Sequence, residues 1–360
     1  MIISIENPKT LALVLLLVGG VIAFILLSNP LNLPYSLPVS LDSPYPKAPE
    51  LQGIAGTINA PDGFSLADVE GKVILVDFWT YSCINCIRTQ PYLNAWHEKY
   101  ADRGLAIVGV HTPEFAFEEK YANVLAAVEK AGIMYPVVLD NDYSTWRAYG
   151  NHYWPRKYLI DAQGFIRYDH IGEGGYAETE AMIQSLLAER DAQPFLEESL
   201  SSEIGVNNPD FARIRTPELY LGYAFARTPL GNPEGFSPEQ IISYSFPDPL
   251  VFTPNIVYLE GEWKNELDHV TLVSSTGKIG LRFTAKHVNI VAGAGENESV
   301  LTVVLSAPPV QNGGDTSITE RILVKEEKLY PLISLSDYGE QEVIIEVAGV
   351  GFQLYTFTFG

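Results

Sequence analysis

Residues 73–86 read VILVDFWTYSCINC, an apolar run followed by two cysteines three positions apart. The run VILVDFW (73–79) has the length and the β-branched content of a buried strand. The segment that follows, NCIRTQPYLNAWHEKYADRG, is typical of a helix. We therefore expect Cys83 near the amino end of a helix, where free backbone N–H groups and the helix dipole favour an anion by about 0.3–1 kcal/mol.

Cys83 and Cys86 are the two cysteines of the chain, so they act as a pair or not at all. Residues three apart on a helix share a face, which brings two sulfurs within reach of a disulfide. A redox-active dithiol is therefore the favoured interpretation. A zinc site is an alternative, but it needs two further ligands, and the histidines lack the H-x(3–5)-H spacing. A purely structural disulfide is another, but so small a loop stabilises a fold poorly.

Asp77 interrupts the apolar strand and alternates onto the same side as Leu75 and Trp79. In a strand covered on both faces this carboxyl is buried, and burial raises the pKa of a carboxyl group. Asp77 is thus a predicted proton acceptor, directly or through water, for the Cys86 thiol when that thiol becomes a nucleophile. The alternative is an acid on an edge strand that faces solvent.

The rest of the chain divides into two regions of different texture. Short apolar runs alternate with helical stretches up to about residue 192, which predicts an α/β domain over 51–195 with a partly parallel sheet. From residue 216 onward, short strands are separated by clusters of Gly, Asn, Asp and Ser. This pattern predicts an all-β sandwich over 216–360, joined to the first domain by a linker over 196–215.

The amino-terminal region carries a membrane signal. Residues 11–28, LALVLLLVGGVIAFILLS, form an uncharged apolar run, and a helix needs about 20 such residues to cross a membrane. We expect residues 1–28 to be a retained transmembrane anchor. A cleaved export signal is the alternative, although the next segment lacks an A-x-A cleavage site. The proline-rich segment 29–50 is predicted to be a semi-rigid tether.

The charge balance limits the partners. Lys and Arg total 23 against 44 Asp and Glu, which gives a formal net charge of -21. The field around such a protein repels phosphate backbones, so nucleic-acid binding is disfavoured. With 47% hydrophobic residues the chain has ample apolar surface for two packed domains.

The cysteine segment resembles the thioredoxin superfamily. The motif FWTYSCINC, with Pro91 after it and WPRKYLID later, is similar to the membrane-tethered extracytoplasmic TlpA-like branch. A closer resemblance is to the soluble carboxy-terminal region of DipZ-type proteins, carried by TYSCINCIRTQPYLNAW, GLAIVGVHTPEF, LDNDYSTWRAYGNHYWPRKYLID and YTFTFG. This likeness runs from about residue 50 to residue 360.

The resemblance implies roles for individual residues. Cys83 would be the attacking nucleophile and Cys86 the resolving thiol. Asp77 would be the buried acid, and Pro155 the cis proline beside the cysteine pair. Other residues expected near the site are Trp79, Ser82, Asn85, Trp154 and Glu114. We expect no cofactor and no metal.

The implied activity is thiol-disulfide exchange at a cell membrane, with soluble domains on the extracytoplasmic side and disulfide-containing proteins as substrates. DipZ-type proteins typically carry a multi-span electron-transfer domain ahead of this region, whereas here one apolar run takes its place. The reductant would then come from a separate membrane electron donor of the CcdA or DsbD type. Many TlpA-like reductases have an acid three positions after the second cysteine. This chain has Thr89 there, and Glu114 is the candidate replacement.

The resemblance also implies that the second domain is a jelly-roll sandwich similar to carbohydrate-binding modules. Trp263, Tyr330 and Tyr355 could then offer flat faces to a sugar. A protein-docking surface and a purely structural role remain alternatives. The competing function for the whole chain is an envelope binding or scaffold protein that recognises a glycan or a protein and whose cysteine pair is idle.

Overall fold

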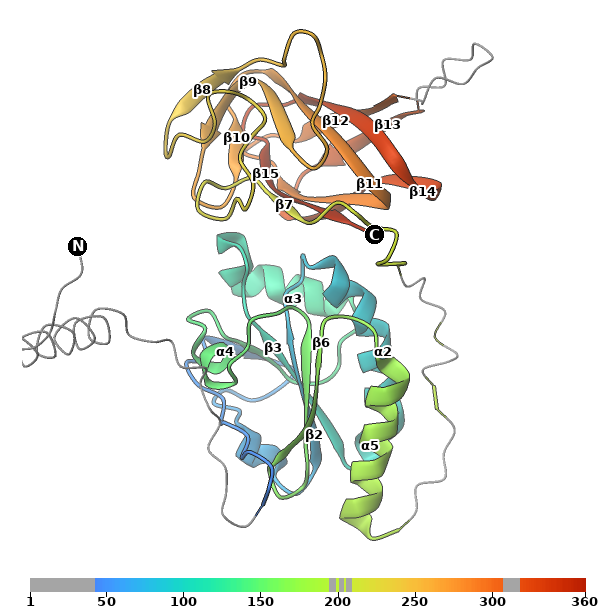
Figure 1. Cartoon of the computed structure of the whole chain (residues 1–360). Helices are drawn as coiled ribbons and strands as arrows, with labels where there is room; N and C mark the ends of the chain where they lie inside the picture. The colour runs from blue at the N-terminus through green and yellow to red at the C-terminus, as the bar shows by residue number, and fades with distance from the viewer. Residues whose placement is uncertain (1–42, 194–198, 201–203, 205–208, 307–317) are drawn as a thin grey trace, which may run out of the picture.

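The computed structural model describes residues 43–193, 199–200, 204, 209–306 and 318–360, arranged as an α/β unit and a β-rich unit (Figure 1). The predicted anchor at 11–28 and most of the predicted tether at 29–50 lie outside these residues. Within the described ranges, no helix combines the length and apolar character needed to span a membrane.

The α/β unit is built around a six-stranded sheet. Its elements are β1 (Gly56–Ile58), η1 (Leu66–Val69), β2 (Val73–Trp79), α2 (Ile84–Tyr100), η2 (Ala101–Arg103), β3 (Leu105–His111), η3 (Ala116–Glu119), α3 (Tyr121–Lys130), β4 (Val137–Leu139), α4 (Ser144–Ala148), β5 (Arg156–Ile160), β6 (Ile166–Ile171) and α5 (Tyr176–Asp191). The strand order is β1-β4-β3-β2-β5-β6. The central strands β2, β3 and β4 are parallel, and the others pair antiparallel. The predicted α/β architecture is confirmed.

Strand β2 lies inside this sheet, and its side chains alternate between two cores. Leu75 packs in one core with Trp96 and the buried faces of α2, α3 and α5. Val76 packs in the other with Trp146 and Tyr149 around α4. Every residue of β2 is buried, so a carboxyl on this strand has no route to solvent.

The β-rich unit consists of nine strands in one sheet. They are β7 (Leu219–Tyr220), β8 (Ile241–Tyr244), β9 (Val257–Asn265), β10 (Val270–Leu272), β11 (Thr276–Gly293), β12 (Ser299–Ser306), β13 (Ile318–Val324), β14 (Lys328–Ala348) and β15 (Gln353–Phe359). Strand β11 pairs with β14, β15 and β9. This third pairing gives part of the sheet a small barrel-like closure. The predicted β-rich architecture is confirmed at this level.

One strand assignment differs from the sequence expectation. The segments KIGLRFTA (278–285) and VNIVAG (288–293) each have the pattern of a short separate strand, but both belong to β11. The register against β14 shifts between Ala285 and His287, where the partners change from Gly339 to Ser334. This irregularity disrupts the ladder locally without ending the strand. The polar pair at 286–287 breaks the alternation of the sequence, and only the pairing with β14 shows that the strand continues.

Candidate redox site

The two cysteines lie in unequal positions at the amino end of α2. Cys83 is the N-cap residue, and its Sγ accepts the backbone N–H of Cys86 at 3.3 Å. Neither cysteine forms a disulfide. Cys83 is half-buried, whereas Cys86 is 1% exposed. A substrate sulfur can therefore meet Cys83 from outside, while Cys86 is reached through Cys83.

Burial also separates the two thiols chemically. It raises the pKa of the Cys86 thiol well above its ordinary value, and the neighbouring Cys83 adds to this effect. Cys86 therefore stays protonated until a base takes its proton. The Cys83 sulfur lies instead at the helix end, where free N–H groups and the helix dipole stabilise an anion.

Asp77 and Lys157 form a buried pair beneath the cysteines. They are opposite each other in the antiparallel β2–β5 pairing, and both are at most 1% exposed. Lys157 Nζ donates to the carbonyl of Gly172 at 3.1 Å. Asp77 Oδ1 has no hydrogen-bond partner among the described residues. The free oxygen leaves Asp77 room to accept a proton.

Burial raises the pKa of Asp77 to about 7, although the Lys157 ammonium opposes this change. Burial lowers the pKa of Lys157, against the attraction of Asp77 and Cys86. The charge of Asp77 in turn adds to the raised pKa of Cys86. The three groups are therefore electrostatically linked, and Asp77 is a base whose pKa lies near neutrality.

Lys157 was not among the residues predicted from the sequence, although the sequence pattern indicates that it is buried. The strand KYLID holds a lysine two positions before Leu159, which is fully buried on the same face. A lysine on the inward face of a strand needs a buried partner. The identity of that partner depends on β5 pairing with β2, and this pairing cannot be read from local pattern.

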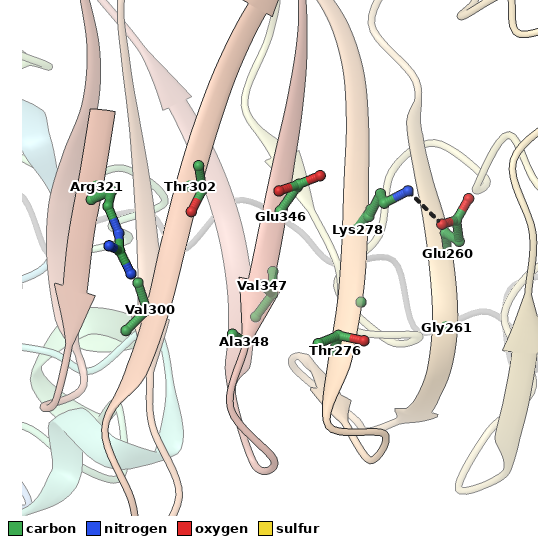
Figure 2. Close-up of a pocket in the computed structure, with 11 residues that line it drawn as sticks. Glu260, Gly261, Thr276, Lys278, Val300, Thr302, Arg321, Glu346, Val347 and Ala348 are labelled. Atoms are coloured by element: carbon green, nitrogen blue, oxygen red, sulfur yellow. Dashed lines mark ion pairs between the residues drawn. The ribbon is translucent and has the colours of Figure 1, made fainter. Parts of the chain in front are cut away.

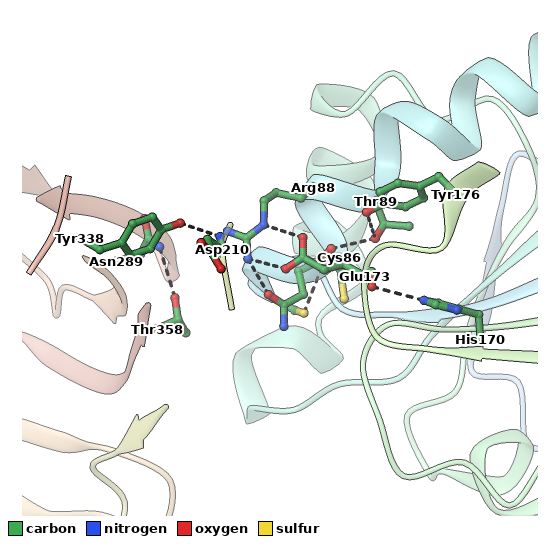
Figure 3. Close-up of polar contacts among 12 residues, drawn as sticks. Cys86, Arg88, Thr89, His170, Glu173, Tyr176, Asp210, Asn289, Tyr338 and Thr358 are labelled. Atoms are coloured by element: carbon green, nitrogen blue, oxygen red, sulfur yellow. Dashed lines mark hydrogen bonds and ion pairs between the residues drawn. The ribbon is translucent and has the colours of Figure 1, made fainter. Parts of the chain in front are cut away.

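An arginine clamp holds the first turn of α2. Arg88 makes a two-pronged contact with Glu173, with Nε and Nη2 donating to its carboxylate oxygens at 2.8 and 2.6 Å (Figure 3). The same Nη2 donates to Asn85 Oδ1 at 2.7 Å. Glu173 lies in the turn between β6 and α5. Asn85, one of the two residues between the cysteines, is thus fixed to a distant loop by a charge-assisted network.

Thr89, at the position where the resemblance implied an acid, is also tied in place. Its hydroxyl donates to the carbonyl of Asn85 at 2.9 Å and lies 3.3 Å from the hydroxyl of Tyr176 (Figure 3). Thr89 is therefore a neutral packing residue of the helix and brings no charge to the cysteines.

The acidic residue that contacts the cysteine loop is Glu118, whereas the sequence analysis proposed Glu114. Glu114 does not turn its carboxylate toward the cysteine loop, because Oε1 accepts the hydroxyl of Tyr220 from the β-rich unit at 2.6 Å. The carboxylate that reaches the loop belongs to Glu118, which accepts the hydroxyl of Ser82 at 2.6 Å. Glu118 was missed because its contact depends on how the turn after β3 folds back.

Glu114→Gln is expected to stabilise the protein at alkaline pH. Burial raises the pKa of Glu114 to about 8, so the folded protein keeps a proton that the unfolded chain releases from about pH 4.5. The free energy of unfolding of the unaltered protein therefore falls as the pH rises from about 5 to about 8. Because Glu114 is only partly buried as a residue, we expect a gain of about 1–2 kcal/mol. Urea unfolding at pH 5.5 and 8.5 measures it.

The exposed Glu119→Gln is the matched control for that prediction, since Glu119 lies one residue beyond Glu118 and faces solvent. The control should change the free energy of unfolding equally at the two pH values. An equal gain for Glu114→Gln at pH 5.5 and pH 8.5 would contradict the proposed buried proton.

The remaining expected residues lie along the same end of the sheet. Trp79 ends β2 opposite His111 of β3, and their rings meet edge to face at 5.1 Å. Trp154 Nε1 donates to the carbonyl of Thr112 at 3.0 Å. The bond between Trp154 and Pro155 is cis. These residues therefore surround the exit of β2, from which the cysteine loop departs.

In the described part of the chain, no group of three or more His, Cys, Asp or Glu side chains is placed to hold a metal ion. His111 is fully buried between Trp79 and Tyr81. Burial lowers its pKa to about 3, so its ring is neutral.

The three aromatic residues considered for sugar stacking lie in the interior of the β-rich unit. Trp263, Tyr330 and Tyr355 are 0%, 7% and 4% exposed, so their faces are covered by protein. A groove of about 440 Å³ does lie on the β-rich unit, where Figure 2 shows polar side chains projecting from neighbouring strands. No aromatic side chain is among the eleven residues that line it. These three aromatic residues pack in the core because burial of their large apolar surface is favourable.

A CxxC pair at the amino end of a helix, directly after a central strand of a mixed sheet, defines a thioredoxin-type redox domain. Residues 47–169 match the AhpC/TSA family, and residues 216–360 match the family described as thioredoxin like C-terminal domain. The chain thus carries a domain that matches the AhpC/TSA family, followed by one that matches the thioredoxin like C-terminal domain.

Its relatives include protein DipZ of Mycobacterium tuberculosis, which is 35% identical over 326 residues, or 87% of this chain and 43% of DipZ. The chain thus spans less than half the length of that relative. Thiol-disulfide oxidoreductase ResA of Bacillus anthracis is 27% identical over 121 residues, or 34% of this chain and 67% of ResA.

Among solved structures, a putative thiol:disulfide interchange protein DsbE from Chlorobium tepidum is 27% identical and covers 43% of this chain and 99% of its own. Its TM-score of 0.35 is too low to support a conclusion by itself.

Proposed function

We propose that this protein is a thiol-disulfide oxidoreductase that reduces disulfides in protein substrates. The observation that carries the proposal is the inequality of the two thiols. Cys83 is accessible at a helix end, and Cys86 is buried above a carboxyl group whose pKa is about 7. One thiol is thus suited to attack, and the other to act only after a proton is removed.

In the first step the Cys83 thiolate attacks one sulfur of the substrate disulfide. The substrate S–S bond breaks, a mixed disulfide forms, and the other substrate sulfur leaves as a thiolate that takes a proton from solvent. In the second step Cys86 gives its proton to Asp77, directly or through a water molecule, and attacks the Cys83 sulfur. The second substrate thiolate leaves, and two electrons have passed from the dithiol to the substrate.

The cycle requires a reductant, because it ends with a Cys83–Cys86 disulfide. We infer that a membrane electron donor of the CcdA or DsbD type supplies the two electrons. The apolar run at 11–28 supports a single-pass membrane anchor, and the prolines of 29–50 support a tether. The redox unit would then work on the extracytoplasmic side, where protein disulfides occur.

We also infer that the β-rich unit is a jelly-roll sandwich of the carbohydrate-module kind. Trp263, Tyr330 and Tyr355 are buried, so they offer no stacking face to a glycan, and the groove of Figure 2 is lined without aromatic residues. We therefore assign this unit a role in presenting protein substrates to the α/β unit. In this role, the contact between the two units is essential.

The proposal is tested by equilibrating the full chain, in detergent, with redox buffers of graded potential and by following insulin reduction. We expect a midpoint close to that of thioredoxin, about −270 mV. A midpoint near that of DsbA, about −120 mV, would reverse the direction of electron flow. A cysteine pair that forms no disulfide in any buffer would instead support the scaffold function with an idle pair.

A further inference from the structure

Residues 113–119 connect β3 to α3 and project into the β-rich unit, which rests on the end of the α/β unit where α3 lies (Figure 1). Phe115 and Phe117 are buried, and they pack with Tyr220, Val291 and Tyr355. The ring centroids of the two phenylalanines lie 5.1 and 4.8 Å from that of Tyr355. We call residues 113–119 the docking segment.

Polar contacts fix the same segment to the β-rich unit. The hydroxyl of Tyr220 donates to Glu114 at 2.6 Å, and the backbone N–H of Ala116 donates to Asp268 Oδ2 at 3.4 Å. Buried aromatic packing and partly buried hydrogen bonds thus act together to couple the position of the segment to that of the β-rich unit.

On its other side the docking segment holds the cysteine loop through one carboxylate. Glu118 Oε1 accepts the hydroxyl and the N–H of Ser82 at 2.6 and 3.3 Å. Glu118 Oε2 accepts the N–H groups of Glu114 and Phe115 at 2.6 and 3.0 Å. Glu118 is fully buried. A carboxylate with four donors is strongly held, and it joins the docking segment to the residue before Cys83.

We propose that Glu118 is a positioning residue through which the β-rich unit holds the Cys83 loop and sets the dithiol–disulfide equilibrium of the cysteine pair. The inference rests on the proposed function only in requiring a redox-active pair. Burial raises the pKa of Glu118, and the hydrogen bonds that its carboxylate accepts oppose this change and favour the ionised form. The ionised carboxylate beside Ser82 disfavours a second negative charge on the Cys83 sulfur. It therefore disfavours the reduced, thiolate-bearing form, and its removal or displacement favours that form.

The experiment compares Glu118→Gln with Tyr355→Leu in the full chain, with redox equilibrium constants measured in dithiothreitol buffers. Glu118→Gln is expected to shift the constant about tenfold toward the dithiol, which corresponds to about 30 mV. Tyr355→Leu removes the ring that meets both phenylalanines and is expected to shift the constant about threefold in the same direction. The rate of Cys83 alkylation as a function of pH provides a second readout.

Two controls separate positioning from general loosening. Tyr355→Phe keeps the ring and loses only a hydroxyl that donates to Gln353 at 3.3 Å. Trp263→Phe disturbs the core of the β-rich unit at a fully buried site outside the docking contact. Both should leave the redox constant within about twofold, although Trp263→Phe lowers stability.

The double variant Glu118→Gln/Tyr355→Leu should shift the constant no further than Glu118→Gln alone, because the ring acts through the carboxylate. Additive shifts, an unchanged constant in Tyr355→Leu, or an equal shift in Trp263→Phe would each overturn the inference. If Glu118→Gln does not fold, Ser82→Ala cuts the same link. Tyr355→Leu must then have a smaller effect on the Ser82→Ala background than on the unaltered protein.

The two proposals fail in different ways. A cysteine pair that never forms a disulfide contradicts the proposed function. A pair that cycles normally, with the same constant in all variants, contradicts only the role of Glu118.

Discussion

Replacing Cys83 with serine is expected to lower the rate of disulfide reduction by the full chain by at least about 10³-fold. A serine hydroxyl at this position does not ionise near neutral pH and cannot attack a disulfide sulfur. Cys86 cannot take over, because it is 1% exposed and lies behind residue 83. The insulin-reduction rate measures the loss, and thermal unfolding should show that the variant remains folded.

In the partner variant, Cys86→Ser, we expect Cys83 still to attack the substrate disulfide, whereas the resulting mixed disulfide can no longer be resolved by residue 86. Substrate should then accumulate as a mixed disulfide on Cys83, visible as a reducible shift on a non-reducing gel. Cys83→Ser and the double variant are the controls, and neither should trap substrate. Equal trapping by Cys83→Ser would mean that Cys86 is the attacking thiol, which would reverse the assignment of the two roles.

Asp77→Asn is expected to slow disulfide reduction at pH 7 by about 10²-fold, the lower end of the usual contribution of a general base. The amide has the size of the carboxyl but accepts no proton. Burial raises the pKa of Asp77 to about 7, so the activity of the unaltered protein should rise with pH around neutrality. The variant should lose this rise. Single-turnover kinetics between pH 5.5 and 9 measure both effects.

Lys157→Met should move the same pH profile instead of removing it. The Lys157 ammonium lowers the pKa of Asp77 against the effect of burial, so its loss raises that pKa further. Half-maximal activity should therefore shift to higher pH. Asp169→Asn, on the exposed side of β6, is the control and should leave the profile unchanged. Unaltered profiles in both Asp77→Asn and Lys157→Met would exclude the pair from proton transfer.

The same pair predicts a change in stability. The folded state holds a proton on Asp77 that the unfolded chain releases above about pH 4, so the free energy of unfolding falls as the pH rises toward about 7. Asp77→Asn removes this loss. The variant should be more stable than the unaltered protein above pH 7, with no gain below about pH 4. Urea unfolding across this range measures the difference.

The amino-acid sequence by itself determined the strand VILVDFW, the helix that starts after it and the pair of cysteines between them. Strand β2 has the bounds that the apolar run predicts, because hydrophobic patterning and turn residues are local properties of the chain. The burial of Asp77 followed from its place on a strand covered on both faces. The local sequence pattern was sufficient to predict those features that depend on residues close together in the sequence.

The tertiary structure alone decided which residues complete the site. Lys157 reaches Asp77 because β5 pairs with β2, and Glu118 reaches Ser82 because the docking segment folds back under the β-rich unit. Arg88 finds Glu173 across 85 positions of the chain. Trp263 became core because strands on both sides cover it. Burial and charge pairing are properties of packed surfaces, and those surfaces exist only once distant segments have come together.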